Sequence, residues 1–180
     1  SPSFFREKIK NQSVVSISLS KNEAGLEAAK FMAHSLDEDF EALRQTSDDM
    51  LVRNGQRPKV FLANLGTTDK FIARSTFIKN FVEAGGIEAL VGPGATSLPA
   101  LRKQANENKC AIAIICGSEG AYSDMLEEAV AVLRECHFKE IWLAGKMHDG
   151  NDLDGNIAMG NNVVGILKHF YEVFAKGDKR

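Results

Sequence analysis

Short apolar runs alternate with helix-type stretches along residues 59 to 174, and this alternation constrains the fold more than any other feature of the chain. Each run has four to six residues and is bounded by glycine, proline or charged residues, as expected for strands. The predicted strands span residues 59–64, 87–91, 111–115, 140–144 and 156–159. Helical periodicity predicts helices over residues 71–84, 97–106, 122–136 and 163–174.

Strands that alternate with helices imply right-handed crossovers and a parallel sheet with helices on both faces. Residues 111–115 are apolar throughout, which is typical of a central strand that is covered on both sides. Five strands within about 120 residues favour the flavodoxin-like strand order over the Rossmann order. We therefore predict an α/β fold with a flavodoxin-like five-stranded parallel sheet.

The chain divides close to Pro58 into two unequal parts. We assign residues 58–180 to the α/β domain and residues 1–57 to an N-terminal helical or linker segment. In that segment, residues 14–19 alternate apolar and polar side chains, which is typical of a strand.

Two helices are expected after that strand, over residues 21–33 and 37–53. In the second of them, Phe40, Leu43 and Met50 stand among many charged residues, which indicates a helix lying on a surface. We expect this segment to pack against the α/β domain or against a partner.

Length and composition exclude several classes of protein. A chain of 180 residues is too short for an eight-fold β/α barrel, which needs about 250. The net charge of −2 provides no general field for nucleic acid or an anionic membrane. The longest apolar stretch, residues 110–116, is far shorter than the roughly 20 residues that span a bilayer.

The three cysteines, an odd number, do not form a disulfide framework, and we expect them to be packing residues in a reducing, cytoplasmic compartment. Because the chain begins with Ser1 and has no initiator methionine, we expect it to be a fragment or a processed chain.

Glycines mark the loops that follow the predicted strands, over residues 64–70, 92–96, 116–120 and 145–155. In an open α/β sheet, ligands bind beyond the carboxyl ends of the strands, and glycine lets a ligand approach the backbone closely. Short strand-to-helix loops also need glycine for turns, so a ligand cleft and ordinary loops both remain open as interpretations.

No familiar catalytic or phosphate-binding motif is complete in these loops. Neither the order of a phosphate-binding loop nor that of a dinucleotide fingerprint is present. Cys116-Gly-Ser118 resembles a nucleophile elbow only superficially, since G-x-S-x-G is absent. An enzyme that uses Cys116 or Ser118 is therefore a weaker alternative, and it predicts a reactive thiolate at neutral pH. Asp149, Asp152 and Asp154 lack the remainder of a calcium-binding loop.

Three stretches of sequence resemble the C-terminal domain of methylmalonyl-CoA mutase. They read RPKVFLANLG over residues 57–66, ARSTF over residues 73–77, and NFVEAGGI over residues 80–87. FEALR at residues 40–44 resembles the linker before that domain, and residues 153–164 resemble its last strand and helix. The similarity covers about residues 40 to 175.

Cobalamin-binding members of this family have a flavodoxin-like domain that carries D-x-H-x-x-G after the first strand, and its histidine ligates the corrinoid. The best alignment places Thr68, Lys70 and Ala73 at the Asp, His and Gly of that motif. A lysine ammonium, with a free pKa of about 10.4, does not ligate cobalt while protonated. The Ser-x-Leu motif is replaced by residues 116–119, and the paired glycines by Ala144-Gly145.

A retained fold with a lost cofactor site resembles the small, non-catalytic subunit of the heterodimeric bacterial mutase. The resemblance implies that this chain is one domain of that subunit and is inactive alone. Its partner would be the large subunit, which carries adenosylcobalamin and isomerises methylmalonyl-CoA and succinyl-CoA in propionate metabolism. No cofactor bound by this chain, no nucleic acid and no membrane are expected, and self-association of the domain stays open.

The alternative is a module that still binds a corrinoid without histidine ligation, or another small ligand. Its cleft would be formed by Gly66, Thr68, Lys70, Gly92, Gly94, Cys116, Ser118 and Gly145.

Overall fold

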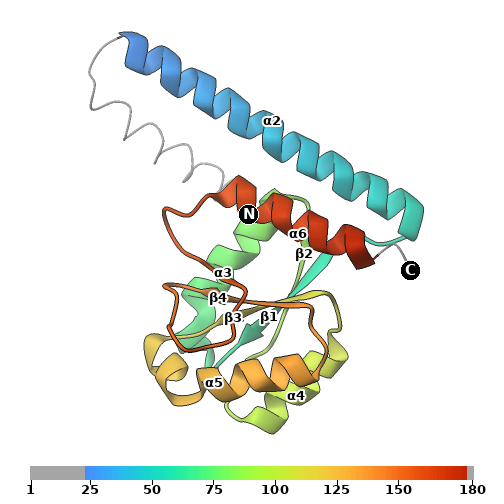
Figure 1. Ribbon diagram of the computed structural model, residues 1–180, viewed down its shortest axis with the longest axis vertical. Coiled ribbons are helices and arrows are strands. Elements are labelled where there is room, and N and C mark those ends of the chain that lie inside the picture. Colours follow the sequence, from blue (N-terminus) through green and yellow to red (C-terminus); the bar gives the residue numbers. More distant parts are fainter. Residues whose placement is uncertain (1–22, 178–180) are drawn as a thin grey trace.

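The computed structural model describes residues 23–177, and these build an α/β fold around one parallel sheet (Figure 1). The strands are β1 (Lys59–Asn64), β2 (Glu88–Val91), β3 (Ile112–Cys116), β4 (Glu140–Ala144) and β5 (Gly155–Ile157). Their order is β2-β1-β3-β4-β5, and every neighbouring pair is parallel. This is the flavodoxin-like order, so the predicted fold class is confirmed.

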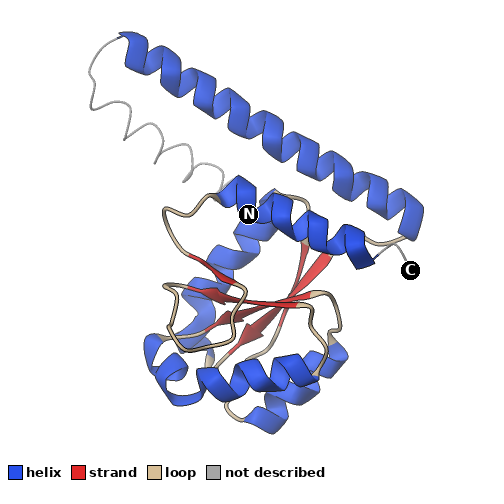
Figure 2. Cartoon of the chain, in the orientation of Figure 1, coloured by secondary structure: helices blue, strands red, loops and turns tan. Residues whose placement is uncertain are grey.

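Helices cover both faces of the sheet (Figure 2). Helices α3 (Thr68–Ala84) and α6 (Val163–Gly177) pack on one face, and α4 (Leu98–Glu107) and α5 (Glu119–Glu135) pack on the other. A further helix, α2 (Glu23–Asn54), lies outside α6.

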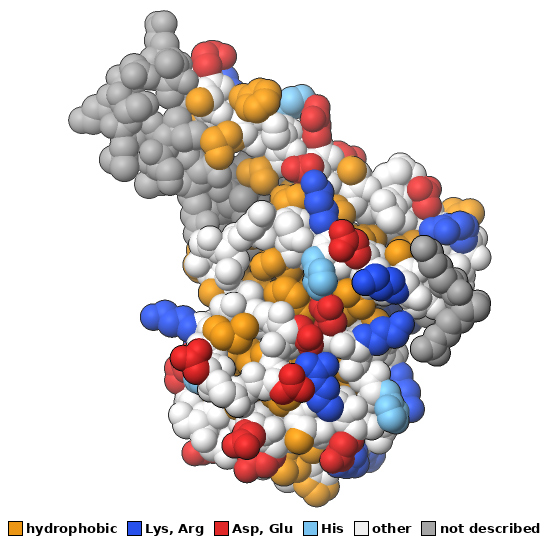
Figure 3. All heavy atoms as spheres, in the orientation of Figure 1, with side chains coloured by type: hydrophobic (Ala, Val, Ile, Leu, Met, Phe, Trp, Pro, Cys, Tyr) orange, Lys and Arg blue, Asp and Glu red, His pale blue; other side chains and the backbone are white. Residues whose placement is uncertain are grey.

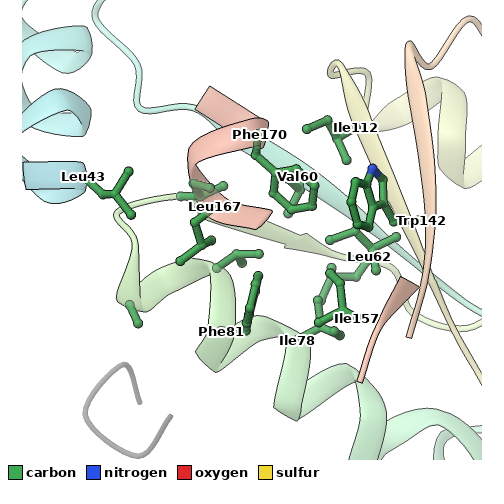
Figure 4. Packing of buried hydrophobic residues seen from close by; sticks show 14 of the residues in the cluster. Leu43, Val60, Leu62, Ile78, Phe81, Ile112, Trp142, Ile157, Leu167 and Phe170 are labelled. Atoms are coloured by element: carbon green, nitrogen blue, oxygen red, sulfur yellow. The ribbon is translucent and has the colours of Figure 1, made fainter. Parts of the chain in front are cut away.

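Alternation of side chains along the strands divides the core into two layers. In β1, Val60 and Leu62 face the layer of α3 and α6, whereas Phe61 and Ala63 face α4 and α5. Because both faces of β1, β3 and β4 are buried, the interior residues of these strands are continuously apolar rather than alternating. Figure 4 shows the first layer, where side chains from α2, α3 and α6 meet those of the strands.

The segment before the α/β domain contains one continuous helix of 32 residues, where the sequence predicts two. No proline or glycine interrupts residues 34–36, and Leu36 extends the apolar stripe between the two predicted helices. Phe40, Leu43 and Met50 continue the stripe at helical spacing and are buried in the core. The strand expected at residues 14–19 lies outside the described residues.

Polar contacts attach α2 to the domain. The Ser47 hydroxyl donates to the carbonyl of Gly86 at 2.6 Å, and Lys168 Nζ lies 3.4 Å from Asp39. The amino-terminal turns of α2 extend past the start of α6 (Figure 1) and carry apolar side chains on their surface (Figure 3). Of these, Phe31 is 72% exposed.

Two helices begin earlier than the periodicity predicts. Helix α3 begins at Thr68 instead of residue 71, and α5 begins at Glu119 instead of residue 122. Their first turns are polar and solvent-facing, so they add nothing to an apolar stripe. Ser97 caps α4, since its Oγ accepts from the amide of Ala100 at 3.3 Å.

Candidate functional site

The eight residues predicted from the loops all lie at the carboxyl edge of the sheet or in the first turn of the helix that follows. Parallel pairing brings the ends of β1 to β4 to this one edge. The eight are Gly66, Thr68, Lys70, Gly92, Gly94, Cys116, Ser118 and Gly145. Their placement is as expected, and a binding role for them stays a prediction.

Lys70 is largely exposed to solvent. It lies in the first turn of α3 with its side chain 61% exposed, and its ammonium is 4.0 Å from the Asp69 carboxylate. Thr68 and Ala73, at the other two motif positions, are exposed as well. These three positions therefore lie on a solvated helix surface that carries a hydroxyl, an ammonium and a methyl group.

The loop after β2 packs tightly against α3. Gly94 has φ +107°, and a Cβ there would lie 2.7 Å from the Phe71 ring and 2.8 Å from the carbonyl oxygen of Gly66. Glycine is required at this position because both the backbone conformation and the space exclude a side chain. The buried ring of Phe71 thus fills the edge beside β1 and β2.

Tyr122, from the first turns of α5, fills the edge between β3 and β4. Its hydroxyl accepts from the amide of Gly117 at 3.0 Å and donates to the carbonyl of Ala144 at 2.7 Å. Burial raises the pKa of the Tyr122 phenol, and the neighbouring Cys116 raises this pKa further. The phenol is therefore a neutral structural group that joins the ends of two strands.

Arg74 crosses the same edge from α3. Its Nη1 donates to the carbonyl of Gly117 at 2.6 Å, its Nη2 donates to Glu119 Oε1 at 2.7 Å, and its Cζ lies 5.2 Å from the Tyr122 ring centroid. The hydrogen bond from Arg74 lowers the pKa of the Glu119 carboxyl, and its charge and that of His148 act in the same direction. The carbonyl of Gly117, the Glu119 carboxylate and the Tyr122 ring together hold the Arg74 guanidinium in place.

His148 belongs to this cluster, although a histidine beside Asp149 in a polar loop is more typical of a solvated residue. Its Nε2 lies 3.1 Å from Glu119 Oε2, and its ring packs edge-on against Tyr122 at 5.5 Å. Sequence reasoning missed Arg74 and Tyr122 as well. The available signal was a tyrosine and an arginine placed next to glycine-bearing loops, and that signal is weak.

Neither predicted nucleophile is placed for catalysis. Cys116 is fully buried in β3, and burial raises the pKa of its thiol. Ser118 caps α5, since its Oγ accepts from the amide of Ala121 at 3.1 Å. Both residues have structural roles, which argues against the enzyme alternative.

Two of the three loop aspartates have ionic partners. Arg134 pairs with Asp152 at 3.2 Å and with Asp154 at 2.8 Å. Across residues 23–177, no cluster of three or more His, Cys, Asp or Glu side chains is arranged to hold a metal ion. In the same range, no helix combines the length and the apolar character needed to cross a membrane.

We expect the protein to lose stability in alkaline solution because of its buried thiols and phenols. Burial raises the pKa of Cys110 to about 12, whereas the thiol titrates near pH 8.5 in an unfolded chain. The folded state keeps its proton while the unfolded state loses it, so the stabilisation is complete below about pH 8.5 and is lost as the pH rises towards 12. The urea concentration at the midpoint of unfolding should decrease from pH 8 to pH 9 and again to pH 10. The decrease should be smaller in Cys110→Ala. An equal decrease in both proteins would contradict a contribution from the Cys110 thiol.

The comparisons with known proteins agree on one family of relatives. A methylmalonyl-CoA mutase small subunit from Streptomyces virginiae is 31% identical over 131 residues, which are 73% of this chain and 21% of that protein. A probable small subunit from Mycobacterium tuberculosis is 36% identical over 107 residues, 59% of this chain and 17% of that protein. The small subunit from Propionibacterium freudenreichii subsp. shermanii is 28% identical over 151 residues, 78% of this chain and 22% of that protein.

A search against family models found no match. Among solved structures, a 3-dehydroquinate dehydratase-like protein from Bifidobacterium longum superposes with a TM-score of 0.41 at 14% identity, over 64% of this chain and 98% of that one. At that score the fold assignment rests on the strand order of the sheet alone. The chain spans about a fifth of the length of its curated relatives. Over that region it is related to the methylmalonyl-CoA mutase small subunits, and the resemblance inferred from the sequence is confirmed.

Proposed function

We propose that this chain is a structural domain of a methylmalonyl-CoA mutase small subunit. In this role it supports a large subunit that carries adenosylcobalamin, and it neither binds the cofactor nor catalyses the isomerisation. The observation that carries the proposal is that side chains occupy the carboxyl edge of the sheet at β1, β3 and β4. Arg74, from the helix after β1, hydrogen-bonds to Gly117 after β3, at the point where the strand order reverses and where an open α/β sheet admits a ligand. Tyr122 joins the ends of β3 and β4.

The side chains at the motif positions do not fit a corrinoid held by a histidine. Lys70 offers an exposed ammonium in place of an imidazole, and Ala73 adds a methyl group where the motif has glycine. His148, the histidine beside the edge, already faces Glu119 and the Tyr122 ring. No step of the mutase reaction is therefore assigned to residues of this chain.

A titration with adenosylcobalamin tests the proposal through the visible spectrum. We expect no spectral shift and no saturation up to about 1 mM cofactor, which corresponds to a binding free energy weaker than about −4 kcal/mol. A saturable, shifted spectrum would contradict the proposal. Saturable binding without a shift would instead favour a corrinoid-binding module that lacks axial ligation, and loss of that binding in Lys70→Ala would assign the residue a role.

Capture of the large subunit tests the partner. Immobilised protein should retain a cobalamin-bearing mutase large subunit from a purified preparation. A variant in which α2 is disrupted, Phe40→Asp, provides a comparison for the contribution of the buried helix. Failure of the intact domain to retain any large subunit would argue against a supporting role for this domain alone.

A further inference from the structure

The amino edge of the sheet, at the opposite end of the strands from the candidate site, carries a separate groove. It has a volume of about 390 Å³ and lies between the carboxyl ends of α2 and α6 and the starts of β1 and β3 (Figure 1). None of the eight residues predicted from the loops lines it. Its size falls within the range of small-molecule sites, which combine an apolar lining with a few placed polar groups.

The floor of this groove is apolar and belongs to the packed core. Met50 of α2 and Phe174 of α6 line it, and both side chains are buried in the core layer of α3 and α6. The backbone beside them is fixed as well, since the carbonyl of Ala111 accepts from the amides of Lys139 and Glu140 at 2.8 and 3.2 Å. The groove is therefore preformed, as most small-molecule sites are.

Three cations line the groove, and among the described residues no acidic side chain does. Arg57 is engaged, because its Nη1 donates to Ser47 Oγ at 2.9 Å and to Asp48 Oδ1 at 2.6 Å. Lys59 and Lys109 make no ion pair within residues 23–177. Two uncommitted ammonium groups above an apolar floor complement a ligand that has an apolar body and two negative charges.

The topology of the sheet brings the two ammonium groups to one place. Lys59 begins β1, Lys109 precedes β3 by three residues, and these two strands are parallel neighbours with Val60 opposite Ile112. Neighbouring strands lie about 4.8 Å apart, so both lysine side chains start from the same part of the edge. A phosphate monoester carries close to two negative charges at neutral pH and offers three oxygens that accept from lysine.

We propose that this groove binds a small phosphomonoester, with its apolar body on Met50 and Phe174 and its phosphate between Lys59 and Lys109. The site goes beyond the structural role proposed above and does not depend on it. It shares no residue with the candidate site at the carboxyl edge.

Isothermal titration with three compounds tests the two parts of the proposal. 1-Naphthyl phosphate has the apolar body and the dianion, 1-naphthalenemethanol has the body alone, and inorganic phosphate has the anion alone. Naphthyl phosphate should bind saturably at one site, and more tightly than either of the others. Lys59→Gln and Lys109→Gln should each weaken it about two- to fivefold, the range for an exposed ion pair, and leave naphthalenemethanol unchanged. Lys103→Gln, an exposed lysine on α4, is the matched control and should alter neither affinity.

Lysines near the carboxyl ends of helices also stabilise those helices, so the thermal transition of each variant is recorded separately. Binding is then measured well below that transition. Absence of saturable binding by the unaltered protein would overturn the site, and so would an unchanged affinity for naphthyl phosphate in the double variant Lys59→Gln/Lys109→Gln. Equal weakening of naphthyl phosphate and naphthalenemethanol would overturn the preference for a phosphate.

Filling the groove tests its location. Gln56 is exposed in the bend after α2 and lines the groove, so Gln56→Trp should fold normally and weaken naphthyl phosphate at least tenfold. Ala131→Trp, on the exposed side of α5, should leave its affinity unchanged. In amide NMR spectra the Cys110 and Ala111 signals should shift on binding, and that of Gly117 at the other edge should not. Unchanged binding in Gln56→Trp with a native thermal transition, or shifts confined to the carboxyl edge, would overturn the proposal.

Discussion

Phe40→Ala is expected to lower the free energy of unfolding by about 3–5 kcal/mol, as large truncations of buried aromatic residues do. Phe40 lies on α2, in the segment that the sequence sets apart from the α/β domain, yet its side chain is fully buried. It belongs to the core layer that includes Phe81 of α3 and Phe170 of α6. Truncation therefore leaves a cavity in the main core, and urea unfolding followed by tryptophan fluorescence measures the loss.

Phe31→Ala on the same helix is the matched control. Its ring is 72% exposed, so the free energy of unfolding should change by no more than about 0.5 kcal/mol. Equal losses for the two variants would mean that α2 does not unfold together with the α/β domain. A large difference would place the domain boundary on the amino side of Phe40 and not near Pro58.

Tyr122→Phe should lower the free energy of unfolding by about 2–4 kcal/mol, although it removes a single oxygen atom. That oxygen satisfies both the amide of Gly117 and the carbonyl of Ala144. Each buried backbone group left without a partner costs about 1–3 kcal/mol. The ring remains to exclude water from the end of the sheet, so neither group regains a partner easily. Chemical denaturation of the two proteins measures the difference.

Amide hydrogen exchange under native conditions separates this explanation from general loosening of the fold. The Gly117 amide should exchange faster in Tyr122→Phe, because its acceptor has been removed. The nearby Ala121 amide, which donates a hydrogen bond to Ser118 Oγ, should retain its protection from exchange. Equal acceleration at both amides would contradict a local role for the Tyr122 hydroxyl.

The sheet was predictable because of its burial. A strand covered on both faces, such as Ile112–Cys116, is apolar at every position. An apolar run of this length is too short for a typical helix, so it favours a strand. The continuity of α2 was not predictable, because His34 and Ser35 interrupt the periodicity without breaking the helix. Starts of helices were missed for a related reason, since their polar first turns resemble loops.

The position of the candidate site was predictable from the sequence, but the side-chain contacts that fill it were not. Parallel topology places every loop after a strand at the same edge, so the positions of Gly66 and Gly145 followed from the strand assignments. The contacts that fill the edge join residues distant in the chain. Arg74 reaches a carbonyl 43 residues away, and Tyr122 reaches one 22 residues away. Main-chain acceptors are not encoded by residue type, so these roles are visible only in the folded structure.

The bridge made by Arg74 also bears on how the domain moves. Its backbone belongs to the helical layer on one face of the sheet, and its acceptors, Gly117 and Glu119, belong to the start of the helix on the other. Sliding or parting of the two layers would break charge-assisted hydrogen bonds, which are stronger than neutral ones. A displacement of α3 relative to the start of α5 would therefore have to break this bridge first.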